Sequence, residues 1–144
     1  MNGRFDVSEM AALVRALDDA ADRVNDRAGL VVKKTANDTV RDAQANVPVD
    51  TGHLKSTIGH DLDEDGLGFE AGPTASYGAD VEFGTTPHEI TPSSKQALYW
   101  PGAPHPVARV WHPGTSPQPY LLPAFDRRAD VAARAFAQVA ADIL

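Results

Sequence analysis

The chain has 144 residues, of which 42% are hydrophobic and 23% are charged, and these values are ordinary for a soluble protein with one domain over residues 1–144. Its formal net charge of −7 argues against a protein that binds nucleic acid by neutralising phosphates, although not against one that surrounds DNA without gripping it. The absence of cysteine excludes disulfides and thiolate metal sites.

Residues 8–46 are predicted to form one long helix that begins at Ser8 as N-cap and stops before Pro48. Such a helix is about 58 Å long at 1.5 Å per residue, and the rest of a small domain cannot cover it. We therefore expect part of it to pack on a neighbouring subunit. Its apolar residues recur mostly at steps of three or four, as in one stripe of an α-helix: Met10, Leu13, Leu17, Ala21, Val24, Ala28, Val31, Ala36, Val40, Ala43 and Val47.

Residues 54–111 are predicted to form a small, mostly antiparallel sheet of about four to five strands. Alternating side chains from Leu54 to His60 favour a first strand, Asp65-Gly66 a tight turn, and residues 67–71 the returning strand. Residues 77–83 are a further candidate strand, although their start also suits a helical turn. Two short strands are expected at residues 97–100 and 107–111.

The polar segment 84–96 is predicted to be a long loop that contacts partners. We expect this loop to become ordered on assembly. Residues 123–144 are predicted to form a C-terminal helix packed on the sheet, with Pro123 in its first turn. The fold class is therefore α+β. The candidate contact residues of the loop are Thr86, Pro87, His88, Glu89, Ile90, Thr91, Pro92, Ser93, Ser94 and Lys95.

Two short motifs are compatible with an enzyme or a metal site. Asp50-Thr51-Gly52 matches the core tripeptide of aspartic proteases, whose paired carboxylates share a proton, but a single copy would need a homodimer. Its place after a helix favours a turn in which Gly52 supplies a special backbone angle. Residues 61–66 match the opening of an EF-hand loop, but Gly72 stands where the closing Glu belongs. A solvated acidic turn is favoured there, and weak cation binding stays open.

The remaining sequence offers no recognisable catalytic motif. The five histidines lack the spacing of a helical metal site, and His112 is expected to bond nearby backbone. There is no GxSxG, phosphate loop or cysteine nucleophile, so an enzyme is disfavoured and neither a metal nor a cofactor is expected. No apolar run approaches the roughly 20 residues of a membrane span. The first ten residues carry no apolar stretch of the signal-peptide type, so we expect a protein made in the cytosol.

Three segments resemble, in this order, the motifs of one protein family over residues 8–140. It is the head–tail joining family of long-tailed bacteriophages, also called neck or tail-completion proteins, with the patterns P-x-D-T-G-x-L-x-x-S-I, Y-x-x-x-x-E-F-G-T and H-P-G-T-x-x-x-P-[FY]-L-x-P-A. One departure is Thr57 in the place of the serine before Ile58. The matching residues are Pro48, Asp50, Thr51, Gly52, Leu54 and Ile58, then Tyr77, Glu82, Phe83, Gly84 and Thr85, and finally His112, Pro113, Gly114, Thr115, Pro119, Tyr120, Leu121, Pro123 and Ala124.

This resemblance implies a structural virion protein and not an enzyme. The implied assembly is a ring, expected to hold six subunits, in the phage neck. It would join the connector of the DNA-filled head, through head-completion proteins, to a tail-terminator or tail-tube protein. DNA would pass through its lumen without specific binding, and no membrane is involved. The alternatives are a tail-terminator ring that caps the tail tube and, less favoured, an aspartic protease or a metal-dependent hydrolase.

Some motif residues have expected structural roles. Gly84 and Gly114 are expected to make turns that larger residues cannot. Glu82 is expected to bond backbone or a partner, and not to perform chemistry. The segment from Pro119 to Pro123 is expected to dock the C-terminal helix on the sheet or on a neighbour.

Overall fold

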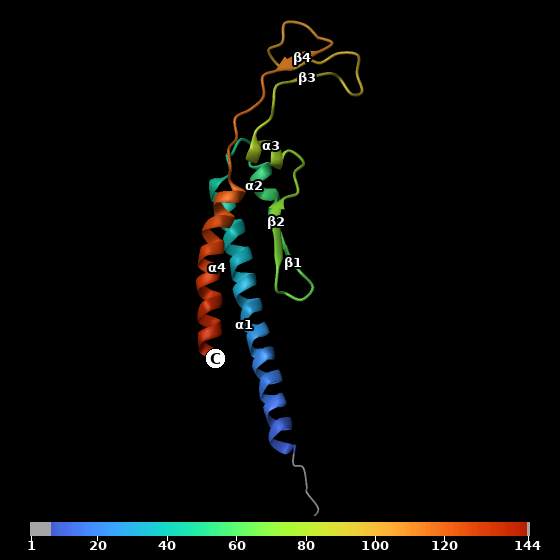
Figure 1. Ribbon diagram of the computed structural model, residues 1–144. Helices are drawn as coiled ribbons and strands as arrows, with labels where there is room; N and C mark the ends of the chain where they lie inside the picture. The colour runs from blue at the N-terminus through green and yellow to red at the C-terminus, as the bar shows by residue number, and fades with distance from the viewer. Residues whose placement is uncertain (1–6, 144) are drawn as a thin grey trace, which may run out of the picture.

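A computed structural model of the protein describes residues 7–143 (Figure 1). The first six residues, part of the stretch considered for a signal peptide, and the predicted helix end at Leu144 lie outside the described residues. The elements in chain order are α1 (Ser8–Asn46), α2 (His53–Thr57), β1 (Ile58–Leu62), β2 (Phe69–Pro73), α3 (Gly78–Phe83), β3 (His88–Ile90), β4 (Val110–His112) and α4 (Leu121–Ile143). The α+β class is thus confirmed. In the described residues the strands form two separate antiparallel pairs, β1–β2 and β3–β4.

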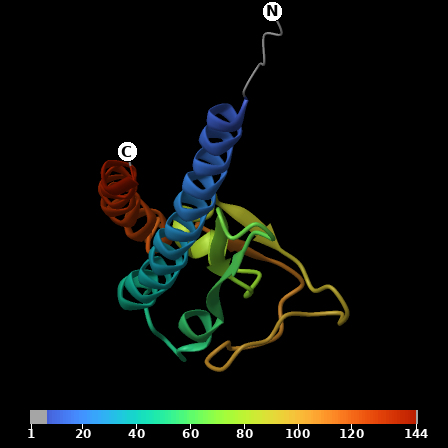
Figure 2. The ribbon, with the colours of Figure 1, turned by 90° about the horizontal axis from the view of Figure 1, so that it is seen from below.

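Helices α1 and α4 lie side by side and form the body of the molecule (Figures 1 and 2). Helix α1 has the predicted bounds, although Val7 and not Ser8 occupies its N-cap position. Helix α4 begins two residues earlier than predicted, at Leu121. Small residues let the two helix backbones approach closely, and those that are buried are Ala36, Ala43, Ala124 and Ala132. Helix α4 therefore packs mainly on α1, and it meets the β1–β2 hairpin through the ring contact of Phe125 with Phe69 at 6.3 Å.

The β1–β2 hairpin packs on α1 and turns through the acidic segment 61–66, as predicted. The predicted strand start at Leu54 is wrong, because residues 53–57 form helix α2. Leu54 and Ile58 lie four residues apart, a spacing that fits one helical face as well as alternate strand positions. The helical turn is fixed by Gly52, whose φ of 84° only glycine adopts readily, and by the bond from the Ser56 N–H to the Gly52 carbonyl at 3.0 Å.

The segment predicted as a third strand forms helix α3 instead, so the alternative of a helical turn at its start was the better one. The polar segment 84–96 is not wholly a loop, because β3 lies within it and pairs with β4. Of the two short strands expected further on, residues 110–112 form β4, whereas Leu98 and Val107 form only an isolated bridge. Together residues 84–118 make an extended arm that leaves the body beside α3 (Figure 1).

The N-terminal part of α1 projects beyond the rest of the body (Figure 1). Asp142, near the end of α4, pairs with Arg27 at 3.5 Å, and the hairpin turn reaches α1 at Gly29, whose added Cβ would lie 3.6 Å from the carbonyl oxygen of Gly66. Residues 8–26 therefore extend past both elements, at the end of the molecule opposite the arm. None of the helices within residues 7–143 is long and apolar enough to cross a membrane.

Candidate functional site: the joint between the helical body and the arm

The three sequence motifs meet where the arm leaves the body. The first motif supplies the turn after α1 and helix α2, the second supplies α3 and the start of the arm, and the third supplies the end of the arm and the start of α4. Motif residues from the first and third segments share one buried cluster, which consists of Ala43, Val47, Leu54, Ile58, Tyr120 and Ala124. Segments about 70 residues apart are therefore packed against one another here.

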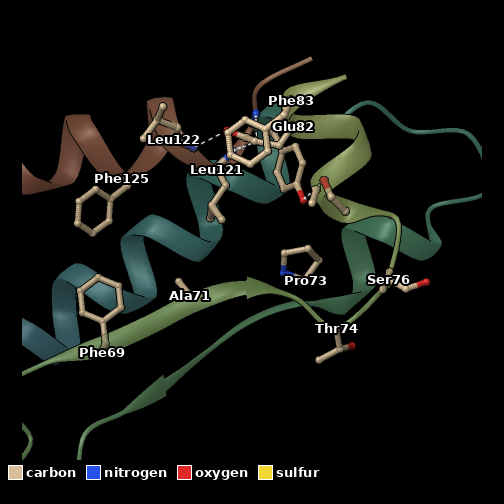
Figure 3. A pocket seen from close by; sticks show the side chains of 14 residues that line it. Phe69, Ala71, Pro73, Thr74, Ser76, Glu82, Phe83, Leu121, Leu122 and Phe125 are labelled. Atoms are coloured by element: carbon tan, nitrogen blue, oxygen red, sulfur yellow. Dashed lines mark hydrogen bonds between the residues drawn. The ribbon is translucent and has the colours of Figure 1, made fainter. Parts of the chain in front are cut away.

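Glu82 links α3 to the start of α4. Its carboxylate accepts the backbone N–H groups of Tyr120, Leu121 and Leu122 at 2.8, 2.9 and 2.9 Å (Figure 3). These are donors that the first turn of a helix leaves without an intrahelical partner, and the helix dipole also favours an anion there. Burial acts to raise the pKa of Glu82, but the three N–H donors outweigh it and hold the pKa below its ordinary value. Glu82 is thus the N-terminal cap of α4, supplied by a distant segment.

Tyr120 anchors the same junction. Its ring is buried, and its hydroxyl donates to the carbonyl oxygen of Gly78 at 3.2 Å. Burial raises the pKa of Tyr120, and the charge of Glu82 adds to the effect. A second bond, from the Gln118 N–H to the Val81 carbonyl at 2.8 Å, holds the returning chain on α3. The segment around Pro119–Pro123 therefore docks on α3 and on the core of the body.

The base of the arm is a reciprocal pair of threonines. The N–H of Thr85 donates to the carbonyl of Thr115 and the N–H of Thr115 to that of Thr85, both at 3.1 Å, and their hydroxyls lie 3.1 Å apart. Beside them, Gly84 and Gly114 have φ of 72° and 86°. A Cβ at Gly84 would collide with the carbonyl oxygen of Thr115, and one at Gly114 with that of Thr85. Glycine is therefore required at both places so that the outgoing and returning segments of the arm can approach each other this closely.

Histidine fixes the turn that follows β4. The Nδ1 of His112 accepts the N–H of Gly114 at 3.0 Å, so this histidine bonds local backbone. Its ring stacks on that of His88 across the β3–β4 pair, with centroids 5.1 Å apart. The strand register places His88 directly opposite His112.

An open apolar groove runs beside the joint. Its upper hollow, about 570 Å³, lies between β2, α3 and the start of α4, with Phe83 and Leu122 at its rim (Figure 3). A second hollow of about 410 Å³ continues between α4, the hairpin and α1, and it ends at Phe136. The two hollows share Phe69 and Phe125. We call the two together the α4 groove. The sequence did not single it out, because its walls come from segments that only the tertiary fold brings together.

A partly buried ionic network ties α4 to α1. The guanidinium of Arg128 donates to both carboxylate oxygens of Asp42 at 2.7 and 2.9 Å and lies 3.6 Å from Asp38. The hydrogen bond from Arg128 is the main cause of the lowered pKa of Asp42, whereas that from Lys34 lowers the pKa of Asp38; burial opposes both. The pairing with Asp42 in turn raises the pKa of Arg128. Sequence patterning missed this network, because it depends on the register between two helices.

Of the two candidate enzyme and metal motifs, Asp50-Thr51-Gly52 lies in the turn after α1 at the joint, whereas the acidic segment 61–66 lies in the β1–β2 hairpin. Asp50 is exposed in the turn after α1, and Thr51 Oγ1 accepts the N–H of His53 at 3.3 Å. The acidic segment 61–66 forms the end of β1 and the start of the hairpin turn, in which Asp65 accepts the N–H of Leu67 at 2.9 Å. Among residues 7–143, no three histidine or acidic side chains are grouped so as to hold a metal ion. The loop residues predicted to contact partners, 86–95, form the outgoing half of the arm and include β3.

Comparison with known proteins gives one family. A family model described as "Bacteriophage HK97-gp10, putative tail-component" matches residues 11–84, which include the first two motifs, α2, the hairpin and α3. No curated protein and no solved structure matches the chain. The matched segment ends at Gly84, where the arm begins.

Proposed function

This chain belongs to the HK97-gp10-like family of bacteriophage tail components, and on that basis we propose that it joins the head connector to the tail as one subunit of a ring in the phage neck. Membership makes it a structural protein of the virion. The ring, its six subunits, its place in the neck and the lack of enzymatic activity are parts of the proposal.

One observation carries the proposal. The chain has two extensions that project from opposite ends of its body, residues 8–26 of α1 and the β3–β4 arm (Figure 1). A joint must hold partners on two sides, and extensions that leave in opposite directions can do so at once. The arm carries exposed aromatic side chains at Tyr99, Trp100 and Trp111, the type of residue that most often anchors a protein interface.

The distribution of charge supports the passage of DNA. The arm has two basic residues and one acidic residue, Lys95, Arg109 and Glu89, so the acidic excess of the chain lies entirely in the remaining residues. If the body faces the lumen, its negative charge repels phosphates and lets DNA slide without sticking. The arm is then free to reach the proteins of the adjacent ring.

The proposal is tested by shortening the arm without disturbing the joint. Residues 91–109 are replaced by a short Gly-Asn turn that connects β3 directly to β4, which leaves the Thr85–Thr115 base and Glu82 intact. In a phage that lacks the gene, the variant is expected to fold but to leave full heads and free tails unjoined in electron micrographs. A matched control replaces only Lys95 and Gln96 with alanine, and normal particles are expected. Normal joining by the shortened arm would overturn the proposal.

A binding assay separates this function from that of a tail terminator. The neck proposal expects the purified chain to bind a head-completion protein as well as a tail-side protein. If the immobilised chain binds the tail-tube protein but no head-completion protein, the chain is a tail terminator that caps the tail tube.

A further inference from the structure

The projecting part of α1 has an apolar face that is exposed within residues 7–143. Residues 9–26 lie beyond the contact of Arg27 with Asp142, and all of them except the half-buried Ala20 are exposed. Yet Met10, Leu13 and Leu17 are between 54% and 63% exposed. These residues, together with Val14 and Val24, form the stripe that we call the α1 stripe. Exposed leucines at helical spacing leave the helix without its main source of stability, because an amphipathic helix is normally stabilised by packing of its apolar face.

The α4 groove is an apolar surface of the opposite shape. Four large side chains along it are between 39% and 69% exposed, namely Phe83, Leu122, Phe125 and Phe136. An apolar concave surface of this size marks a place where another chain binds. Its floor includes Val32 and Thr35 of α1, so the groove could receive a helix that lies along this face of the body.

The stripe and the groove match in length and spacing. From Met10 to Val24 the stripe covers 14 steps of helix, and from Leu122 to Phe136 the groove wall covers 14 steps as well, about 21 Å in each case. Met10, Leu13, Val14 and Leu17 recur at three and four residues, as do Leu122, Phe125, Ala129, Ala132 and Phe136 along the groove wall. This is the pattern by which the side chains of one helix fit between those of another. Within one chain they cannot meet, because the stripe lies beyond the end of α4.

We infer that the α1 stripe of one copy of this chain docks in the α4 groove of the next copy, an inference that rests on the proposed ring and names its subunit interface. A contact of stripe with groove uses a different surface on each partner. Such a contact is heterologous, and repeated around an axis it closes a ring. Each copy then uses its stripe once and its groove once, so both of these apolar surfaces are covered.

The area is sufficient for a stable contact. Aromatic side chains bury roughly 150–250 Å² each and aliphatic ones somewhat less, so covering the exposed parts of the stripe and the groove removes on the order of 900 Å² of apolar surface. Since interfaces are about 60% apolar, the total is about 1,500 Å², within the range of specific protein interfaces.

Cysteine cross-linking tests the docking directly, because the chain has no cysteine of its own. Leu17→Cys is mixed with a second variant that carries Leu122→Cys, Ala129→Cys or Phe136→Cys, and the mixture is oxidised. In one chain Leu17 and Ala129 are roughly 35 Å apart along the two helices, far beyond the 7 Å limit of a disulfide. We expect a covalent dimer of the two different variants for at least one of the three positions. Leu30→Cys is the control, since Leu30 is 68% exposed on the opposite face of α1 and should give none.

Oligomeric state provides the second readout. At about 50 µM, above the micromolar Kd expected for such an interface, the wild-type chain should elute as an oligomer in light scattering. Leu13→Asp with Leu17→Asp should convert it to a monomer with unchanged circular dichroism, and Phe136→Asp should do the same from the groove side. Leu30→Asp should leave the oligomer intact. A monomeric wild type, cross-links of Leu17 to Leu17 alone, or no cross-link at any groove position would overturn the inference.

The inference and the proposed function can fail separately. If the shortened arm fails to join heads to tails while the wild-type chain is monomeric, the function stands and the interface is refuted. If the stripe docks in the groove while a shortened arm joins particles normally, the interface stands and the function is refuted.

Discussion

Glu82 accepts the backbone N–H of Tyr120 at 2.8 Å, across 38 residues of sequence. The residues between them form the arm, so this bond closes the arm at its root and ties α3 to α4 without passing through the arm itself. The arm can therefore vary in length while the body keeps its shape. The family match that ends at Gly84 has its boundary at this same place.

Removing the charge of Glu82 should destabilise the protein. Glu82→Gln keeps the size of the side chain but weakens three hydrogen bonds to a buried carboxylate, and bonds to charged groups contribute about 1.5–3 kcal/mol. We expect the free energy of unfolding to fall by about 2 kcal/mol in urea titration. The matched control is Glu89→Gln, whose exposed ion pair with Arg109 spans 3.6 Å and should contribute less than about 1 kcal/mol. Equal effects of the two substitutions would contradict the capping role.

Acid should unfold the protein through the same carboxylates. The pKa values of Glu82, Asp38 and Asp42 lie below the ordinary values of 4.5, 3.8 and 3.8. Below the ordinary values the unfolded chain binds more protons than the folded one, so the stabilisation is complete above about pH 5 and is lost as pH falls through the lowered values. Urea midpoints measured from pH 7 to pH 2 should therefore be flat above pH 5 and drop below pH 4. In the double variant Glu82→Gln with Asp42→Asn, the urea midpoint should fall less below pH 4. An unchanged fall would show that these two carboxylates do not cause the acid unfolding.

Arg128 should contribute far more to the free energy of unfolding than its neighbour Arg127. Arg128→Met leaves Asp42 and Asp38 without their main partner between the helices, and because this pair is only partly buried we expect a cost of about 2 kcal/mol, less than that of a fully buried pair. Arg127 is exposed and lies 3.9 Å from Asp42, so Arg127→Met should cost less than about 1 kcal/mol. Thermal unfolding of both variants distinguishes them, and Asp42→Asn combined with Arg128→Met should recover part of the loss. A loss under 1 kcal/mol for Arg128→Met would refute the importance of this pair.

Gly114 should tolerate no side chain. Gly114→Ala places a Cβ against the carbonyl oxygen of Thr85 in addition to the strain of its positive φ. We expect the base of the arm to open, seen as fast hydrogen exchange at the amides of Thr85 and Thr115. Gly102→Ala is the matched control, because Gly102 has φ of 94° but open space around it, and only about 1 kcal/mol of local strain is expected. Protected amides in Gly114→Ala would show that the crossing does not need glycine.

The sequence predicts the parts of this fold that depend on local pattern. The long stripe of apolar residues predicts helix α1, and Ser8 and Pro48 predict its bounds. The acidic turn predicts the hairpin. Leu54 was misassigned because a spacing of four satisfies both a helix and a strand. β3 was missed because His88–Ile90 is polar and exposed, and its strand conformation comes only from pairing with β4. The cap by Glu82 depends on a contact across 38 residues, and no local pattern fixes such a distance.

The continuity of α1 has a geometric consequence for any change in its length. One residue inserted between Asp26 and Arg27 would advance the projecting end by about 1.5 Å and rotate it by about 100°, which turns the stripe away from its face. An insertion of seven residues restores the phase to within about 20° and carries the end some 10 Å further. A change in the length of the helix therefore also changes the direction of its apolar face. Its length can change in steps close to whole heptads while the direction of its apolar side is kept.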